Sequence, residues 1–145
     1  MKYPRSGLRI RSEKGIHPEV RAVCLNFGRW PRENIDFPNR VVVYVKSDYQ
    51  IKTHKTKEYV AATFLAPYDK DVESYIRIAT GDYDELIQDR GKVNALYAML
   101  DTFAHEIIHY QQWINDEKMD EDEAEEKGFK LVDRYSETIE MILDF

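Results

Sequence analysis

The sequence predicts a single α+β domain, residues 1–145, in which helices cover one face of a mainly antiparallel sheet. The chain has the usual length of one domain, and its apolar and charged contents, 43% and 33%, are those of folded proteins. A helical pattern comes first, β-branched runs follow, and two more helical patterns end the chain. A run of strands followed by a run of helices is typical of the α+β class.

The first helix is expected to begin at Pro18, a residue suited to the first helical turn. Apolar residues then recur at steps of three and four up to Trp30, and the helix is expected to end between Gly28 and Pro31. Three strands follow, with a fourth if the last range also pairs: 41–45, 59–65, 75–78 and 51–55. Residues up to Lys14 form an arm that could cover a cleft.

The spacing predicts two final helices, over 93–114 and from about Asp120 to Leu143. On the first of these, the apolar positions cluster on one face, and His105 and His109 lie roughly 140° to 180° from its centre. The two histidines are therefore expected to point away from the core.

Composition indicates a cytoplasmic protein without a membrane anchor. No apolar stretch approaches the roughly 20 residues needed to cross a bilayer, and residues 1–10 lack the apolar block of a signal peptide. The single cysteine, Cys24, fits a reducing compartment and is expected to be buried. The sequence carries no signal for an oligomeric state.

Charge divides the chain into a basic front and an acidic back. Residues 1–60 hold 13 Lys and Arg against 6 Asp and Glu, and residues 61–145 hold 8 against 21. The front half could contact an anion such as nucleic acid, or the two halves could attract each other within one fold. No known nucleic-acid-binding motif accompanies the charge, so nucleic acid is kept only as an alternative partner.

The segment His105-Glu106-Ile107-Ile108-His109 matches HExxH. Two histidines four residues apart on a helix can share a tetrahedral metal, and the glutamate between them can act on a metal-bound water without being a ligand. No histidine follows His109, so the third ligand is expected among the carboxylates of 116–126. His17 and His54 are expected to be ordinary surface or packing residues.

This pattern resembles gluzincin-type zinc metallopeptidases, in particular the minigluzincins and the ImmA/IrrE-like enzymes. These zincin-like proteins carry a ligand glutamate on the helix after HExxH, commonly directly before alanine. The resemblance implies Glu123, which precedes Ala124, as the third ligand, with Glu121 and Glu125 as alternatives. Lys127 stands where thermolysin-like enzymes have an aspartate that orients a histidine ligand, so Asp101 is the candidate for that role.

The resemblance implies a zinc-dependent metallopeptidase acting on a peptide or protein substrate. Zn²⁺ held by His105, His109 and Glu123 would leave one position to water, and Glu106 would take the proton of that water. Tyr110, Tyr135 or one of the loop tyrosines is expected to stabilise the oxyanion, and the sequence does not choose among them. The substrate is expected to pair with 75–79 as a sheet edge.

Three alternatives remain. A regulatory or degenerate protein could bind zinc without hydrolysis, and a DNA-associated protease could use the basic front half. A di-iron site would need a second ExxH motif and a helix bundle.

Overall fold

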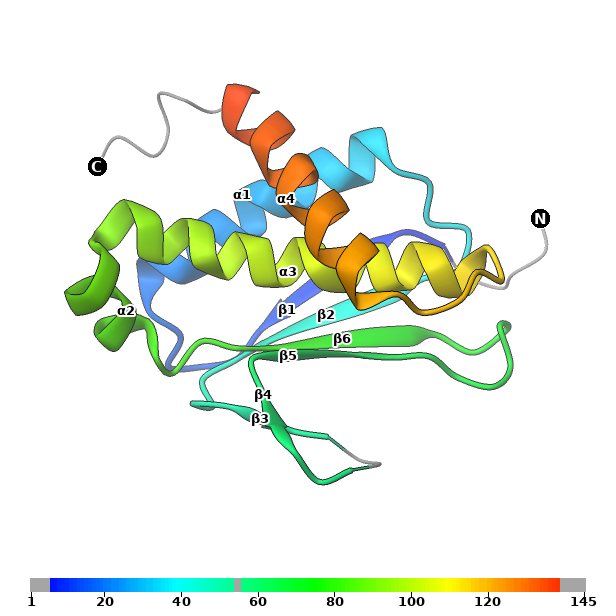
Figure 1. The fold of residues 1–145 in the computed structure, drawn as a ribbon, viewed down its shortest axis with the longest axis horizontal. Coiled ribbons are helices and arrows are strands. Elements are labelled where there is room, and N and C mark those ends of the chain that lie inside the picture. Colours follow the sequence, from blue (N-terminus) through cyan, green and yellow to red (C-terminus); the bar gives the residue numbers. More distant parts are fainter. Residues whose placement is uncertain (1–5, 54–55, 139–145) are drawn as a thin grey trace.

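The computed structural model describes residues 6–53 and 56–138. Helices lie on one side of a four-stranded sheet, and a small hairpin projects from the other side (Figure 1). The sheet has the order β1 (Leu8–Ser12), β2 (Val41–Lys46), β6 (Ser74–Ala79) and β5 (Ala62–Leu65). The hairpin consists of β3 (Ile51–Lys52) and β4 (Tyr59–Val60). The helices are α1 (Pro18–Asn34), α2 (Tyr83–Arg90), α3 (Lys92–Ile114) and α4 (Glu121–Thr138).

The α+β class is confirmed, but the prediction of a mainly antiparallel sheet is wrong. β1 pairs in parallel with β2, β2 pairs in parallel with β6, and only β5 and β6 are antiparallel. The β2–β6 pair is parallel because β3, β4 and β5 lie between them in the chain and return it to the same end of the sheet. The other parallel pair involves β1, which lies in the N-terminal arm and was not predicted as a strand. Because α1 connects β1 to β2, it carries the chain back across the sheet, and such a crossover produces a parallel pair.

Two predicted elements differ in extent. The predicted strand over 59–65 is interrupted at Ala61, so that its two ends belong to different sheets. The first helix continues through Gly28 and Pro31 to Asn34. A methyl group on Gly28 would lie 2.3 Å from Cδ1 of Ile10, so this glycine marks close packing of α1 on β1 rather than a helix end.

The remaining helices agree with the sequence except in two places. The short helix α2 was not predicted, because Tyr83 is its only buried residue and its apolar periodicity is weak. The last predicted helix is seen up to Thr138, and its remaining predicted residues lie outside the described ranges. Over 6–53 and 56–138, no helix combines the length and apolarity that crossing a bilayer requires.

Helix α3 is the centre of the fold. It packs between the sheet on one side and α1 and α4 on the other (Figure 1). Buried residues therefore occur around most of its circumference, including Leu96, Ala104, Ile108, Gln112 and His109. The expectation that both histidines point away from the core is wrong for His109, which is only 6% exposed. Because the sheet and two other helices cover α3, residues outside its apolar stripe can also be buried.

Candidate metal centre

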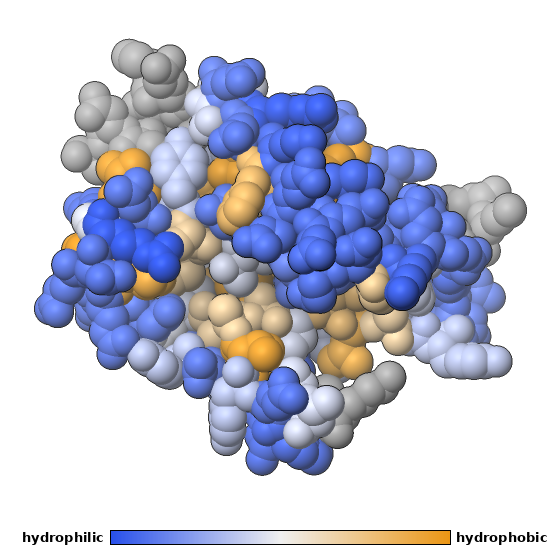
Figure 2. All heavy atoms as spheres, viewed as in Figure 1, coloured by the Kyte–Doolittle hydropathy of each residue, from blue (hydrophilic) through white to orange (hydrophobic). Residues whose placement is uncertain are grey.

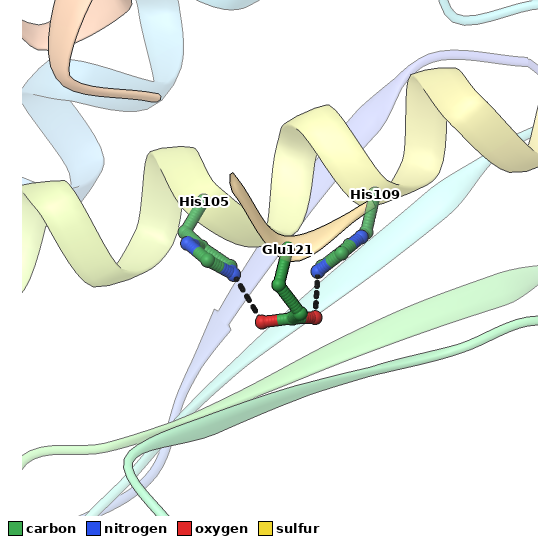
Figure 3. A group of neighbouring side chains, drawn as sticks. All are labelled: His105, His109 and Glu121. Carbon is green, nitrogen blue, oxygen red and sulfur yellow. Dashed lines mark hydrogen bonds and ion pairs between the residues drawn. The ribbon is translucent and has the colours of Figure 1, made fainter. Parts of the chain in front are cut away.

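Two histidines of α3 and the first residue of α4 converge on one point. The imidazoles of His105 and His109 point from α3 toward the carboxylate of Glu121 (Figure 3). Nε2 of His105 lies 3.1 Å from Oε2 of Glu121, and Nε2 of His109 lies 2.6 Å from Oε1. One ligand atom from each residue lies within 4.8 Å of the other two. Among the described residues, this is the only such cluster with metal-ligand chemistry.

The donor set and its geometry fit a divalent metal ion. Two imidazole nitrogens and a carboxylate oxygen are the ligands of catalytic zinc sites, in which donor atoms lie about 3.3 Å apart around a tetrahedral ion. Nε2 of His109 is buried and makes no hydrogen bond of acceptable geometry, although the Glu121 carboxylate is in contact with it. A small shift of the Glu121 carboxylate away from the two imidazole rings would bring its oxygens and the two Nε2 atoms to the separation that zinc requires.

Gln112 orients His109. Its side chain is 1% exposed, and its Oε1 lies 2.8 Å from Nδ1 of His109. The amide oxygen can only accept, so Nδ1 of His109 donates to it, and Nε2 is the ring nitrogen that faces Glu121 and is available to a metal. This residue was missed by sequence reasoning. The available signal was a polar residue three positions after a candidate ligand, on the same helical face.

Gln112 also ties the end of α3 to the start of α4. Its Nε2 donates to the carbonyl of Asp120 at 3.1 Å and to Oε1 of Glu123 at 2.9 Å. The amide N–H of Asp120 in turn donates to Oε1 of Gln112 at 3.3 Å. One buried amide therefore fixes both a histidine ring and the backbone next to Glu121.

The structure brings Glu121, and not Glu123, to the histidines. Glu123 accepts the hydrogen bond from Gln112 and pairs with Lys127 at 3.4 Å. Residues two positions apart on a helix are rotated by roughly 200° from each other, so Glu121 and Glu123 cannot both face the same point on α3. Glu125, the other alternative, is exposed. The choice of Glu123 relied on its position before Ala124, whereas the rotation of α4 over α3 decides which carboxylate faces the rings.

Glu106 lies in a cleft next to this cluster. The cleft has a volume of about 320 Å³, and its walls come from α3, from Met119 and Glu121, and from β5 and the β3–β4 hairpin. Hydrophobic residues gather between α4 and this hairpin (Figure 2). Glu106 is 7% exposed. Burial raises its pKa to about 7, with His109 lowering the pKa and Glu121 raising it further. The structure therefore places a carboxyl group with a near-neutral pKa beside the candidate ligands.

The two tyrosines considered for the oxyanion lie in the core. The hydroxyl of Tyr110 donates to the carbonyl of Asn39 and accepts from the Asn39 amide. Tyr135 packs edge-on against Phe27, with 5.0 Å between ring centroids. Neither residue lines the cleft. Both serve packing, because their rings fill the interior between the layers.

Asp101 does not take the orienting role expected of it. It lines a different pocket, beside Arg90, Asn94 and Tyr97. Burial and the neighbouring charge of Asp133 raise its pKa to about 6. Of the other two histidines, His17 caps α1 by accepting the Glu19 amide at 3.1 Å, a structural role, and His54 lies outside the described residues.

The expected substrate edge also changes place. β6, the strand over 75–79, lies between β2 and β5 in the interior of the sheet. The edge strand beside the cleft is β5, which contributes Ala62, Thr63 and Phe64 to its wall. β6 pairs with β2 on one side and with β5 on the other, so neither of its edges is free for a substrate.

Comparison with family models, with curated proteins and with solved structures finds no match to this chain. The function is therefore argued from the geometry of the site: two histidines and a glutamate that can hold a metal ion, next to a buried carboxyl group.

Proposed function

We propose that this protein is a zinc-dependent peptidase whose centre is formed by His105, His109 and Glu121. The observation that carries the proposal is the convergence of these three side chains beside the buried carboxyl of Glu106. Three protein ligands leave a tetrahedral ion one position for a reactant, which is typical of catalytic rather than structural zinc. Bound zinc would supply a Lewis acid that polarises the scissile carbonyl and makes water more acidic.

Glu106 is the proposed general base. Its carboxylate takes a proton from the water that attacks the peptide carbonyl and gives this proton to the leaving amine nitrogen as the C–N bond breaks. Burial raises the pKa of Glu106 to about 7 in the metal-free protein, and the charge of a bound ion would lower it toward the carboxylate form that a base needs. Gln112 keeps the His109 ring in one orientation during this cycle.

The cleft supports an extended peptide as the substrate. β5 pairs with β6 along one edge only, so its other edge offers backbone N–H and C=O groups to an incoming strand. Apolar side chains in the wall, such as Val60, Phe64 and Met119, favour a substrate with apolar side chains. Recognition through backbone hydrogen bonds predicts broad sequence tolerance and a preference for unfolded polypeptide.

The test compares zinc content with hydrolysis in Glu106→Gln. The wild-type protein should bind about one zinc per chain and cleave denatured casein, and a chelator should stop cleavage. Glu106→Gln should keep the zinc and lose hydrolysis, and the matched control Glu125→Gln, at an exposed site on α4, should keep both. Full activity in Glu106→Gln would rule out its role as base.

A second candidate is a zinc-binding regulator without hydrolytic activity. The observation that favours it is the position of Tyr110 and Tyr135 in the core, away from the cleft. Among the described residues of the cleft wall, the Thr53 hydroxyl is already bonded to Thr56 and Glu58, and Thr63 lies at an outward position of β5. An oxyanion donor normally contributes a large part of catalysis. Zinc binding by the wild type together with no cleavage of any unfolded substrate would select this candidate.

A further inference from the structure

The outward face of the sheet carries a distinct set of side chains. Alternate residues of a strand point to opposite faces, and Val43, Val45, Ile76 and Ile78 point into the core. The residues between them point away from the helices. On that side, within the described parts of the chain, only the β3–β4 hairpin projects from the sheet (Figure 1).

Three arginines and two tyrosines occupy the middle of this outward face. The strand register places Arg11, Tyr44 and Arg77 in one row across β1, β2 and β6, and Arg9 and Tyr75 in the next row, on either side of Val42. We call these five residues, Arg9, Arg11, Tyr44, Tyr75 and Arg77, the tyrosine–arginine face. The two rings touch edge to face, with 6.0 Å between centroids. Tyr44 is 38% exposed, Arg9 and Arg11 are exposed, and Tyr75 and Arg77 are half-buried.

In residues 6–53 and 56–138, the arginines of the tyrosine–arginine face differ from the other cations of the sheet in having no acidic partner. Lysine and arginine at the two ends of the sheet have acidic partners: Lys46 pairs with Glu13 at 3.2 Å, and Arg40 pairs with Glu73 at 3.6 Å. No ion pair within the described residues involves any of the three central arginines. The outward positions of the four strands contain no Asp or Glu: Arg9, Arg11, Val42, Tyr44, Lys46, Thr63, Leu65, Tyr75, Arg77 and Ala79.

Arg77 has spare hydrogen-bonding capacity. One terminal nitrogen donates to the carbonyl of Lys52 in the hairpin at 3.4 Å, and Nε makes no hydrogen bond. The backbones of Arg11 and Arg77 lie two strands apart, about 10 Å, and Tyr44 occupies the same row on the strand between them. This alternation of cation, ring and cation along one row offers both charge and stacking surface.

We propose that the tyrosine–arginine face binds single-stranded nucleic acid. Arginines would pair with phosphates, and bases would stack on the ring of Tyr44 and on the guanidinium planes, as unpaired bases do on open sheets. The choice of nucleic acid over an anionic membrane rests on the edge-to-face ring pair set between cations in one row, which matches stacked bases and their phosphates. The net charge of −6 on the chain opposes general adhesion to polyanions, so binding would be confined to this face.

This inference is independent of the proposed peptidase activity. The tyrosine–arginine face lies on the opposite side of the sheet from α3 and α4, which carry His105, His109 and Glu121. It holds whether the metal centre hydrolyses peptides or only binds zinc. The two proposals therefore stand or fall by separate measurements.

Fluorescence anisotropy of the whole chain with labelled oligonucleotides tests the proposal. Single-stranded RNA and DNA of about 12 nucleotides and mixed sequence, and the matching DNA duplex, are titrated at roughly 50 and 200 mM salt. Both single strands should bind more tightly than the duplex, and the ratio between RNA and DNA identifies the preferred sugar. Three arginine–phosphate contacts predict a slope of about −2 for log K against log salt concentration.

Matched variants locate the binding. Tyr44→Ala should weaken binding about tenfold, whereas Tyr44→Phe, which retains the ring, should leave it nearly unchanged. Arg9→Ala/Arg11→Ala/Arg77→Ala should remove most of the affinity and most of the salt dependence. The control Arg21→Ala/Arg29→Ala removes two exposed cations from α1, on the helical side, and should bind normally. Far-UV circular dichroism checks that each variant is folded.

Four outcomes would overturn the proposal. The first is no binding of either single strand at the lower salt concentration. The second is an equal loss of affinity in the α1 control, which would indicate adhesion by overall charge. The third is equal binding to phosphatidylserine vesicles that survives Tyr44→Ala. The last is a dimer in analytical ultracentrifugation that the triple arginine variant converts to monomer, which would make this face a contact between two copies.

Discussion

Gly128 of α4 lies against the backbone of His105 of α3. A Cβ atom at Gly128 would be 3.1 Å from the amide nitrogen of His105 and 3.2 Å from its Cα. Because the helices meet at this glycine, α4 is held close enough for its first residue, Glu121, to reach both imidazoles.

Gly128→Ala should therefore weaken zinc binding. The added methyl group presses on backbone that cannot move aside, so α4 must shift by a few tenths of an ångström and carry Glu121 with it. Metal sites tolerate displacements of only about 0.5 Å, and we expect zinc affinity to fall roughly tenfold. Gly28→Ala in α1 is the control, since its methyl would meet the mobile end of Ile10 and leave zinc affinity unchanged. Equal zinc affinity in the wild type and Gly128→Ala would contradict the packing argument.

Replacing Gln112 should also loosen the metal. Gln112→Leu keeps the volume of the side chain but removes the hydrogen bond that fixes His109, and such changes cost about 10- to 100-fold in metal affinity. Competition with a fluorescent zinc chelator measures the effect. Gln111→Leu, one residue earlier on the same helix, should bind zinc like the wild type. If both variants lose affinity equally, the cause is stability of α3 and not orientation of the ring.

Zinc should stabilise the folded protein through Glu121 and not through Glu123. At a free zinc concentration of 100 times Kd, binding adds about 2.7 kcal/mol to the free energy of unfolding. Glu121→Gln should lose this gain, since it removes the carboxylate that faces both rings. Glu123→Gln should keep most of it. Thermal unfolding with zinc and with chelator measures the gain in stability for each variant. A gain that is lost in Glu123→Gln and kept in Glu121→Gln would make Glu123 the third ligand.

Asp101 should make stability depend on pH. Burial, followed by the charge of Asp133, raises its pKa to about 6 in the folded protein, above the ordinary value of 3.8. The folded state then binds the proton more tightly, so the free energy of unfolding falls as pH rises from about 4 to about 6 and stays lower above that. Asp101→Asn should raise the free energy of unfolding at pH 7 by about 1 kcal/mol, allowing for solvent screening, with no gain at about pH 3.

Chemical denaturation across this pH range measures the effect of Asp101. Asp122→Asn on the exposed start of α4 is the control and should show no comparable gain at pH 7. A constant difference between Asp101→Asn and the wild type at every pH would mean that packing, and not charge, is responsible.

The long helices and the candidate metal ligands on α3 could be predicted because each depends on local spacing. A spacing of four residues places the side chains of His105 and His109 on the same face of the helix, wherever that helix packs. β1 could not be predicted in the same way, since its strand pattern is short and its parallel pairing depends on α1. The burial of His109 was also beyond local periodicity, because it results from a sheet and two helices enclosing α3.

The third ligand marks the limit of sequence reasoning at the site. Glu121, Glu123 and Glu125 are chemically identical, and only their rotation about α4 distinguishes them. That rotation is set by Gly128 against His105 and by the bonds that Gln112 makes to Asp120 and Glu123. Each of these is a contact between two helices, so no pattern within one helix could reveal it.

All of the candidate ligands lie within one helical hairpin, between His105 and Glu121. Closing so short a loop costs little chain entropy, and helical hairpins form much faster than non-local strand pairs. At the proposed zinc centre, the ion would therefore be within reach of a nascent chain whose sheet has not yet assembled. In such a chain the ion would act as a folding nucleus, and newly made protein starved of zinc would mature more slowly.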